Sequence, residues 1–320
     1  MSSRFNKDTK IFVAGHAGML GSAFMRRLND AGYQNIIVAP HVELDLARQQ
    51  DVDDFLAQHR PEVVILAAGR VGGIIENRDN PGDFISDNLQ LQLNVMSAAR
   101  RVKVNKLLFF ASSCMYPREC SQPMTEEMLM TGRPEPTSLA YATAKMAGLQ
   151  TCLAYNQQDG GNNFIPVIPN TIYGPGDNFD LGSSHVLPAL LRRFHQAKQQ
   201  GVDSVTLWGS GTPRREFVYV DDVVEAVLFL LQHEQGDLEL PINIGVAKDC
   251  SIAELATMIA TVVGYQGEIS WDTSKPDGAP RKLLDSQRLF NLGWLPKTDL
   301  TSGLAKTYSW FLEQHGCVND

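Results

Sequence analysis

The chain has 320 residues, of which 43% are hydrophobic and 20% are charged, a composition that excludes a disordered chain and suits one large α/β unit or two modest domains. The 28 Lys and Arg residues and 36 Asp and Glu residues leave a net charge of -8, which disfavours generic nucleic-acid or anionic-membrane binding. An anionic ligand must therefore be met by a local cluster of cations.

Short apolar runs alternate with amphipathic segments through the first hundred residues. The pattern predicts strands and helices in alternation: strands at 10–15, 35–39, 62–68 and 106–113, helices at 19–32, 48–59 and 84–102. Because the strands are apolar on both faces, we expect a doubly wound parallel sheet covered by helices, a Rossmann α/β fold. After residue 165, prolines and glycines interrupt the pattern, which predicts a smaller C-terminal α/β lobe over the strand ends, where such sheets bind ligands.

The cysteines and the start of the chain indicate a reduced, cytoplasmic setting. No apolar signal region precedes the first strand, and no apolar run approaches the roughly 20 residues of a membrane span. HExxH and CxxC motifs are absent, so we expect no metal site. The five cysteines are irregularly spaced, which favours free thiols: Cys114, Cys120, Cys152, Cys250 and Cys317.

Three glycines follow the first predicted strand in the stretch GHAGMLG: Gly15, Gly18 and Gly21. Glycines there allow a tight turn and a close backbone approach, so that the helix N-terminus can face a pyrophosphate. Two further strand–helix units follow, and in this context the turn predicts a dinucleotide site. We expect residues 1–168, with 216–247 returning to them, to form the NADP-binding domain, and 169–215 and 248–320 to form the substrate-binding lobe.

The end of the second strand leaves the choice between NADP and NAD open. The segment 39–41, Ala-Pro-His, offers neither the carboxylate that pairs with a free ribose hydroxyl nor an arginine for a ribose phosphate. His16 and His41 are candidates to face an adenosine phosphate, with solvated loop histidines as the alternative. Asp45 and Leu46 are placed to meet the adenine.

The stretch YATAK puts Tyr141 and Lys145 four residues apart, on one face of a helix. A phenol ionises near pH 10, too high for efficient proton transfer at neutral pH, but a neighbouring ammonium and the positive nicotinamide ring would lower its pKa. Tyr141 is thus a candidate proton donor to a carbonyl that receives hydride. Taken alone, a Tyr–Lys pair at this spacing is more often a surface coincidence.

Together with the glycine turn and Ser112 at the end of the fourth strand, this stretch resembles the extended short-chain dehydrogenase/reductase family, whose members combine GxxGxxG, a Ser or Thr and YxxxK. The resemblance implies that Ser112 hydrogen-bonds the substrate carbonyl oxygen, Tyr141 is the acid and Lys145 orients the cofactor ribose. A nucleotide sensor on the same fold would be expected to have lost the Tyr–Lys pair, which is intact here.

Cys114 distinguishes this chain within the family. Ser113 and Cys114 stand where the dehydratases carry an acidic pair, and simple 4-epimerases have no use for a thiol. A cysteine at a strand end is more often a small buried hydrophobe. A thiolate is nevertheless a competent base next to a ketone if positive charge lowers its pKa, and His185 supplies a second group that titrates in the right range.

Stretches such as KLLFFASSCMYP, SHVLPALLRRFHQAK and WGSGTPRREFVYVDD extend the resemblance to the members that act on GDP-4-keto-6-deoxy sugars. It implies a bifunctional enzyme that epimerises GDP-4-keto-6-deoxy-D-mannose at C3 and C5 and reduces C4 with NADPH, giving GDP-L-fucose. A related GDP-4-keto sugar of the colitose or deoxyheptose type is the alternative. Cys114 is then the base and His185 the acid, with their order at each carbon open.

The resemblance also implies ligand contacts. Four residues would bind the diphosphate and guanosine: Arg193, Trp208, Arg215 and Lys282. Arg192 and Arg214 could replace the neighbouring arginines, Trp208 could belong to the core, and His195 is expected on the helix surface. The cofactor would meet Gly15, His16, Ala17, Gly18, Met19, Leu20, Gly21, Asp45, Leu46, Ala67, Ala68, Lys145, Pro169, Asn170, Thr171, Ile172 and His185.

Two further expectations follow from the resemblance. Ala17 stands where the family usually carries an arginine, so this chain lacks a usual contact to the adenosine phosphate. Related enzymes pack two long helices from each subunit into a four-helix contact, which predicts a homodimer through the helices near 84–102 and 140–158. An ordinary covering of the sheet is the alternative for these helices.

Overall fold

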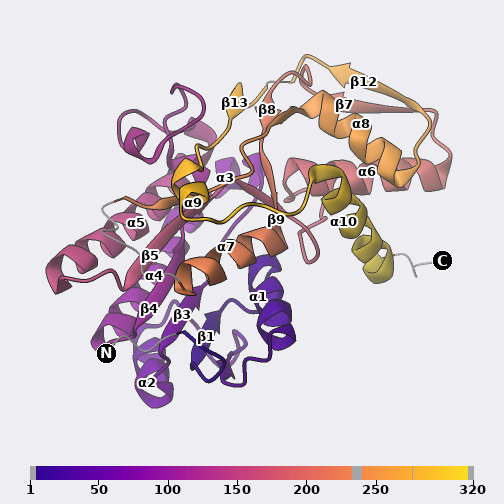
Figure 1. The fold of residues 1–320 in the computed structure, drawn as a ribbon. Coiled ribbons are helices and arrows are strands. Elements are labelled where there is room, and N and C mark those ends of the chain that lie inside the picture. Colours follow the sequence, from indigo (N-terminus) through magenta and orange to yellow (C-terminus); the bar gives the residue numbers. More distant parts are fainter. Residues whose placement is uncertain (1–4, 233–239, 276, 316–320) are drawn as a thin grey trace.

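The computed structural model describes residues 5–232, 240–275 and 277–315. Six parallel strands form the central sheet in the order β10-β5-β4-β3-β1-β2 (Figure 1). Their bounds are β1 Ile11–Ala14, β2 Ile36–Ile37, β3 Val63–Leu66, β4 Lys106–Phe110, β5 Phe164–Pro169 and β10 Ile242–Ile244. The parallel sheet confirms the predicted Rossmann fold class.

Helices cover both faces of this sheet because its strands are buried on both sides. One hydrophobic cluster joins β1, β3 and β5 to α1 and α7, and a second joins β1, β3 and β4 to α2, α4 and α5. The helix bounds are α1 Met19–Asp30, α2 Gln49–His59, α3 Ile74–Asp79, α4 Pro81–Arg101, α5 Leu139–Asp159 and α7 Val220–Gln232. The helices predicted at 19–32 and 48–59 exist with shorter ends, and the one predicted at 84–102 begins earlier, at Pro81. Helix α3 was not expected.

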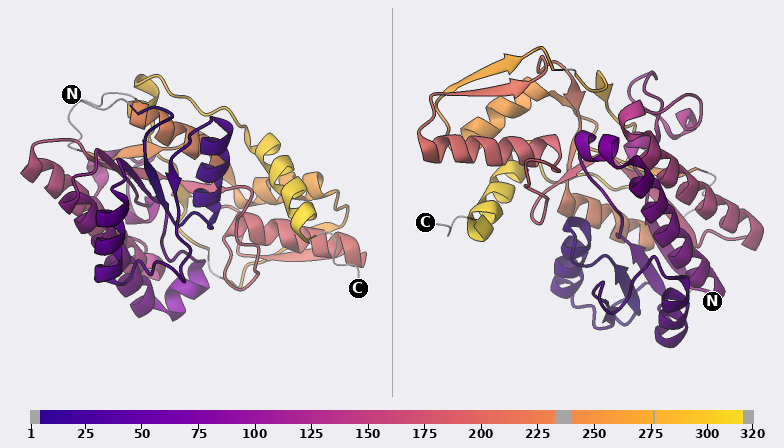
Figure 2. Two further views of the ribbon diagram at one scale, coloured as in Figure 1. Left: turned by 90° about the horizontal axis from the view of Figure 1, so that it is seen from below. Right: turned by 180° about the vertical axis from the view of Figure 1, so that it is seen from behind.

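Most of the remaining elements form a second layer with a hydrophobic cluster of its own, shown beside the sheet in Figure 2. Helix α9 (Gln287–Asn291) instead packs against the main sheet, where Leu289 belongs to the first cluster. Strands β7 and β12 pair in parallel, β8 pairs with β11 and β13, and β6 pairs with β9. The bounds are β6 Thr171–Tyr173, α6 Val186–Gln200, β7 Ser204–Trp208, β8 Arg214–Arg215, β9 Phe217–Tyr219, β11 Cys250–Ser251, α8 Ile252–Val263, β12 Glu268–Asp272, β13 Arg281–Lys282, α9 Gln287–Asn291 and α10 Leu300–His315.

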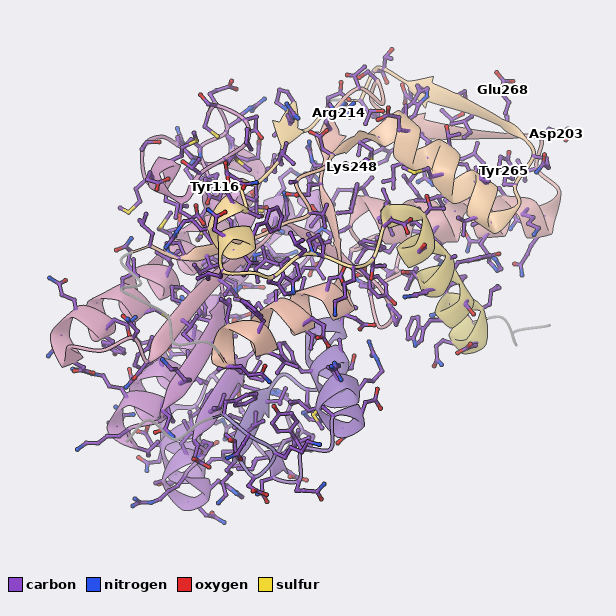
Figure 3. The ribbon with its side chains drawn as sticks, viewed as in Figure 1. Tyr116, Asp203, Arg214, Lys248, Tyr265 and Glu268 are labelled. Carbon is purple, nitrogen blue, oxygen red and sulfur yellow. The ribbon has the colours of Figure 1, made fainter. Side chains whose placement is uncertain are left out.

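The outer end of this layer is fixed by local hydrogen bonds far from the sheet. Tyr265 donates its hydroxyl to the Val202 carbonyl at 3.0 Å, and the Glu268 amide donates to Asp203 at 2.8 Å. Figure 3 shows Asp203, Tyr265 and Glu268 together there, well away from Tyr116. The end of the layer that meets the sheet is therefore the one that can contribute to a shared site.

The topology places the carboxyl ends of β1, β3, β4 and β5 along one edge of the sheet. The chain leaves β1 for β2 on one side and reaches β3 on the other, so the strand order reverses there. Ligands of open α/β sheets bind in the crevice outside such a reversal. The glycine turn after β1 and the SSCMYP stretch after β4 both lie at this edge.

The structure tests, in part, two expectations from the composition, free cysteines and the absence of a membrane span. Cys114, Cys120, Cys152 and Cys250 are free thiols, whereas Cys317 lies outside the described residues. Within the described ranges, no helix has both the length and the apolar character needed to cross a membrane.

Gly148 of α5 offers a test of the helix packing. A Cβ built there lies 2.4 Å from the Phe109 ring and 2.8 Å from the Gln92 amide, whereas one at Gly82 of α4 meets nothing within 4 Å. We predict that Gly148→Ala lowers the free energy of unfolding by about 1–3 kcal/mol, because overpacking outweighs the gain in helix propensity. Urea unfolding followed by circular dichroism measures this, with Gly82→Ala as the matched control. Equal stability of the two variants would contradict the packing.

Candidate active site

The turn after β1 forms a cradle of backbone. Gly15 has φ +86°, and a Cβ there would lie 2.6 Å from the Ala68 nitrogen, while one at Gly21 would lie 2.0 Å from the Gly15 oxygen. Gly18 is exposed and precedes α1, and its own Cβ would meet only the Gly15 oxygen at 3.6 Å. A side chain at Gly18 would thus fill the open space before the helix N-terminus. The turn suits a dinucleotide pyrophosphate, which needs that space.

The loop after β2 gathers charge around Asp45. Its carboxylate lies 4.0 Å from the His41 ring and 3.5 Å from the Arg48 guanidinium, and it accepts the Ala47 amide at 3.0 Å. The Leu46 carbonyl accepts the Asn94 side chain at 2.9 Å. Arg48 was missed at the sequence level because it directly precedes α2, several residues beyond the strand end where such an arginine is expected. His41 and Arg48 are both exposed and able to meet a phosphate.

Tyr141 and Lys145 lie on α5 as the YATAK spacing predicts. The Lys145 ammonium is buried, donates to the Phe110 carbonyl at 2.9 Å and lies 5.8 Å from the centre of the Tyr141 ring. Burial lowers the pKa of Lys145 to about 8. Burial and the nearby Cys114 raise the pKa of Tyr141, while a hydrogen bond from Ser112 opposes them. Tyr141 thus holds its proton at neutral pH, which a proton donor requires.

This corrects one half of the expectation for Tyr141, that a neighbouring ammonium lowers its pKa. The contribution of a nicotinamide ring stays a prediction. Lys145 does not dominate because its ammonium points to the Phe110 carbonyl at the end of β4 rather than to the phenol oxygen. Desolvation of the buried phenol is the larger effect.

Cys114 sits in a short turn directly after β4. Ser112 begins this turn, and its hydroxyl accepts the Cys114 amide at 3.2 Å. The Lys282 ammonium lies 3.8 Å from the Cys114 sulfur. Burial by itself would raise the pKa of the thiol, but Lys282 and the hydroxyls of Ser112 and Ser138 outweigh it and lower the pKa below its ordinary value. Cys114 is therefore biased toward the thiolate, and Ser138 is a contact that sequence reasoning missed.

Lys282 connects the thiol to the substrate lobe. It lies on β13, paired in parallel with Arg215 of β8. His185 directly precedes α6, and burial together with the Lys282 charge lowers its pKa. The pKa of Arg215 is lowered by burial and raised by the nearby Cys114. The structure thus gathers the predicted proton-transfer groups around one ammonium.

Arg193 and Trp208 are both placed at strand β7. Arg193 donates to the Thr206 carbonyl of β7 at 3.3 Å, and Trp208 ends the same strand. Trp208 is 58% exposed, so the alternative that it belongs to the core is wrong. The exposed indole offers a flat apolar face that suits a base, and the Lys275 ammonium lies 5.9 Å from the centre of its ring. Arg193, which contacts the same strand, offers a cation that suits a phosphate.

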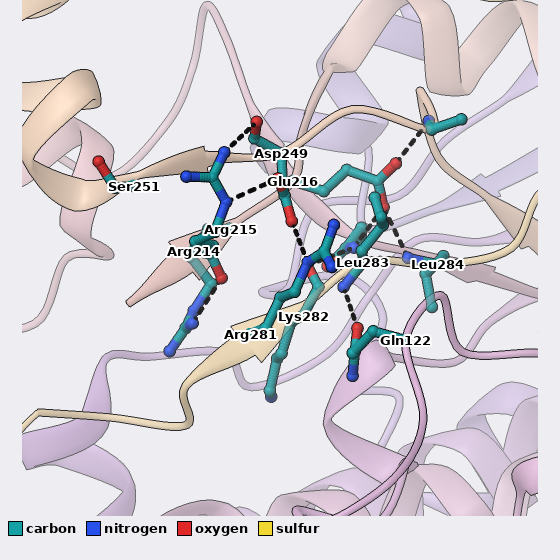
Figure 4. Close-up of polar contacts among 12 residues, drawn as sticks. Gln122, Arg214, Arg215, Glu216, Asp249, Ser251, Arg281, Lys282, Leu283 and Leu284 are labelled. Atoms are coloured by element: carbon teal, nitrogen blue, oxygen red, sulfur yellow. Dashed lines mark hydrogen bonds and ion pairs between the residues drawn. The ribbon is translucent and has the colours of Figure 1, made fainter. Parts of the chain in front are cut away.

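Three residues that the sequence places outside the site or offers as substitutes make contacts of their own: His195, Arg214 and Arg192. His195 is buried, and its ring hydrogen-bonds the Tyr308 hydroxyl at 3.0 Å, so the prediction that it lies on the surface is wrong. The apolar contacts of α6 with α10 pull it into the second layer. Arg214 pairs with Asp249 at 2.9 Å, and in Figure 4 it is directed toward that carboxylate. Arg192 donates to the Phe179 carbonyl. Arg193 and Arg215 likewise donate to backbone carbonyls, so all four arginines stay candidates for the ligand.

Asn170 lies buried after β5, between Pro169 and Thr171. Its side-chain oxygen accepts the Ser113 hydroxyl at 3.2 Å, and its side-chain nitrogen donates to the Glu216 carboxylate at 2.5 Å. The side chain is fully engaged inside the protein. Any contact of this segment with a nicotinamide therefore falls to the backbone.

Among residues 5–232, 240–275 and 277–315, no group of three or more His, Cys, Asp or Glu side chains is placed to hold a metal ion. The chemistry available to the described site is that of a buried phenol, a thiol, an imidazole and several cations. A phenol that retains its proton can protonate an oxygen, and a thiolate can remove a proton from carbon.

Known proteins resemble the chain along nearly its whole length. Residues 11–245 match the NAD dependent epimerase/dehydratase family. GDP-L-fucose synthase 1 of Arabidopsis thaliana is 50% identical, over 98% of this chain and 96% of its own. A GDP-6-OMe-4-keto-L-xylo-heptose reductase from C. jejuni superposes with TM-score 0.92 at 35% identity, over 98% of this chain and 100% of its own. A GDP-L-fucose synthetase from Naegleria fowleri bound to NADP has TM-score 0.90 at 28% identity, over 99% and 96%.

The pairing of Cys114 with Lys282 makes a direct prediction. Lys282→Met removes the ammonium, so we expect the pKa of the Cys114 thiol to rise by about one unit and its alkylation at neutral pH to slow about tenfold. The pH dependence of iodoacetamide labelling, read at Cys114 by peptide mass spectrometry, measures this. Cys114→Ser supplies the background from other thiols. An unchanged labelling profile would show that Lys282 does not hold the thiolate.

Proposed function

Because the chain belongs to the NAD dependent epimerase/dehydratase family, as its glycine turn, Ser112 and YATAK stretch predicted, we propose that it converts GDP-4-keto-6-deoxy-D-mannose to GDP-L-fucose with NADPH. The reaction inverts C3 and C5 and then reduces the C4 ketone. The observation that carries the proposal is the thiol of Cys114, held toward its thiolate beside a Ser–Tyr reductase pair. A plain reductase needs no such thiol.

The reductive half depends on the buried phenol. NADPH, when bound in the glycine cradle, supplies a hydride to the C4 carbon. Tyr141 gives its proton to the oxygen of that ketone, and Ser112 holds the same oxygen by a hydrogen bond. Lys145, whose pKa of about 8 lets it carry a proton at neutral pH, lies beneath the phenol and orients the ribose of the cofactor.

The epimerising half uses the ketone before it is reduced. Protons on C3 and C5 are acidic because the adjacent C4 carbonyl accepts the charge that their removal leaves. Cys114 accepts a proton from one face of the ring, an acid returns a proton to the other face, and the carbon is inverted. His185 is the second group, and either residue is able to act as base at one carbon and as acid at the other.

The charge of Lys282 links substrate binding to the protonation of Cys114 or His185, one of which must act as the acid. This charge helps to outweigh burial and lowers the pKa of Cys114, and it adds to burial in lowering the pKa of His185, so both groups lose a proton more readily than usual. The diphosphate of a GDP-sugar carries negative charge. When it binds Lys282 and Arg215, it opposes the ammonium and raises the pKa of both groups, which returns a proton to one of them. Binding of the correct substrate class therefore prepares the proton transfer.

We propose that two pairs of residues bind the GDP moiety. Arg215 and Lys282 meet the diphosphate near the thiol, while Arg193 and Trp208 meet the guanosine end at β7. Guanidinium groups bind phosphate in a fork geometry and stack on bases, which suits both positions. This arrangement supplies the local cations that an acidic chain needs for an anionic ligand.

NADP is the cofactor that the relatives and the loop chemistry favour. A similar structure from Naegleria fowleri is described as bound to NADP. Arg48 supplies positive charge after β2, and His41 supplies a ring beside it, although Ala17 offers no cation at the glycine turn. We further propose that the cofactor lies along a row of residues at the sheet edge: Gly15, His16, Ala17, Gly18, Met19, Leu20, Gly21, Asp45, Leu46, Ala67, Ala68, Lys145, Pro169, Asn170, Thr171, Ile172 and His185.

A related GDP-4-keto sugar is the second candidate substrate. The heptose reductase from C. jejuni, at 35% identity, shares the fold closely. The higher identity of 50% to a GDP-L-fucose synthase favours the 6-deoxy-D-mannose derivative. The two candidates differ in the substituents of the sugar ring, so they are separated by assaying both substrates.

Three coarser expectations belong to the same proposal. Residues 1–168 with 216–247 would serve the cofactor, and residues 169–215 with 248–320 would serve the sugar nucleotide, which the separate hydrophobic cluster of the second layer supports. A homodimer would form through α4 and α5, which pack side by side and leave Leu93 half exposed. The free thiols of the described cysteines suit the cytoplasm.

The function is tested by assaying the purified protein with GDP-4-keto-6-deoxy-D-mannose and either NADPH or NADH. We predict consumption of NADPH with formation of GDP-L-fucose, and slower turnover with NADH because only the phosphorylated cofactor gains from Arg48. Loss of cofactor absorbance and chromatography of the sugar nucleotide report the two products. Absence of NADPH consumption with this substrate, alongside turnover of a heptose analogue, would transfer the assignment to the second candidate.

A further inference from the structure

Glu216 is a buried carboxylate that no part of the proposed reaction uses. It lies between β8 and β9 and is 0% exposed. One of its oxygens accepts the amides of Val246 and Ala247 at 2.7 and 2.8 Å, and the other accepts the Asn170 side chain at 2.5 Å and the Leu284 amide at 3.0 Å. Figure 4 shows Glu216 beside Leu284.

The four donors come from three segments that are distant in the sequence. Asn170 follows β5, Val246 and Ala247 follow β10, and Leu284 follows β13. Gly245 makes room for the carboxylate, because a Cβ there would lie 2.6 Å from its oxygen. The carboxylate therefore joins the carboxyl edge of the main sheet to the strand that carries Lys282.

The contacts of Glu216 fix the backbone of Lys282 from both sides. The Lys282 carbonyl accepts the Glu216 amide at 3.3 Å and the Asn170 side chain at 3.4 Å. Two residues further on, the Leu284 amide donates to the Glu216 carboxylate. Strand β13 has only two residues, so its ladder gives little support of its own.

The same junction reaches the turn that holds the thiol. Asn170 accepts the hydroxyl of Ser113, the residue next to Cys114, and donates to Glu216. One buried side chain thus contacts the thiol turn, the carboxylate and the backbone of Lys282. The distance of 3.8 Å between the Lys282 ammonium and the Cys114 sulfur is set across this junction.

We propose that Glu216, acting through Asn170 and the backbone of Lys282, is a positioning residue that keeps the Lys282 ammonium beside the Cys114 thiol. The proposal rests on the assigned role of Cys114 as a base. It explains why a carboxylate is buried within a site for an anionic substrate. Each of its oxygens receives two N–H donors, an arrangement that suits the ionised form, although burial raises the pKa of Glu216.

The direction in which the pKa of Cys114 changes on substitution of Glu216 distinguishes a positioning role from a direct electrostatic effect of the carboxylate. A carboxylate near a thiol disfavours the thiolate, so removing its charge would by itself lower the pKa of Cys114. Loss of the Lys282 ammonium from its place has the opposite effect and raises that pKa. In Glu216→Gln, the amide nitrogen cannot accept the N–H donors that the carboxylate accepts, so the Lys282 segment loses contacts while size is preserved.

We predict that Glu216→Gln raises the pKa of the Cys114 thiol and slows its alkylation at neutral pH several-fold, toward the rate of Lys282→Met. Combining Glu216→Gln with Lys282→Met should slow labelling no further than Lys282→Met alone, because the carboxylate acts through the ammonium. Iodoacetamide labelling over a range of pH measures all three. The assay needs no sugar nucleotide, so its outcome is independent of the substrate assignment.

Asp222→Asn is the matched control. Asp222 is also a buried carboxylate, and it holds a different segment by accepting the amides of Lys297 and Thr298 at 3.2 and 2.8 Å. Asp222→Asn should lose as much stability as Glu216→Gln but leave the pKa of the Cys114 thiol unchanged. An unchanged or lowered thiol pKa in folded Glu216→Gln, or an equal rise in Asp222→Asn, would overturn the proposal. If Glu216→Gln does not fold, Asn170→Ser is labelled in the same way, with the same expected rise and the same contradicting results.

Discussion

The charge of one ammonium organises the site. Lys282 lies 3.8 Å from the Cys114 sulfur, where its charge helps to outweigh burial and lowers the pKa of the thiol. Burial lowers the pKa of the His185 ring, and the same charge adds to that effect. Without that charge, a half-buried cysteine would remain a neutral, unreactive thiol. The same ammonium is placed to meet the diphosphate of a sugar nucleotide. Under the proposed function, substrate recognition and proton transfer both depend on this one cation, which links the specificity of the site to its chemistry.

This interaction requires both layers of the fold. Cys114 follows β4 of the main sheet, whereas Lys282 belongs to a two-residue strand of the second layer. A thiolate and an ammonium brought from separate layers have no fixed distance unless a third group joins them. The buried network of Asn170 and Glu216 provides that connection. A fully satisfied polar network is rigid, whereas an incomplete one is costly, so this junction has to be complete.

The sequence predicted the fold class and most of the first-domain elements because buried parallel strands are short, continuous apolar runs. It also brought Ser112, Tyr141 and Cys114 together through spacing and family resemblance. It did not predict the burial of His195, the raised pKa of Tyr141 or the contact of Ser138 with the thiol. These depend on tertiary packing, desolvation and an irregular turn, none of which has a periodic pattern. Glu216 was missed for the same reason, since its partners lie far apart in the chain.

The central claim is that Cys114 adds epimerisation to a reductase site. Deuterium uptake into the sugar ring in D2O, followed by mass spectrometry of the nucleotide sugar, tests it most directly. The account predicts incorporation from solvent at C3 and C5 by the unmodified protein, continued incorporation without reduction by Tyr141→Phe, and much slower incorporation by Cys114→Ser. Incorporation by Cys114→Ser at the rate of the unmodified protein would contradict it.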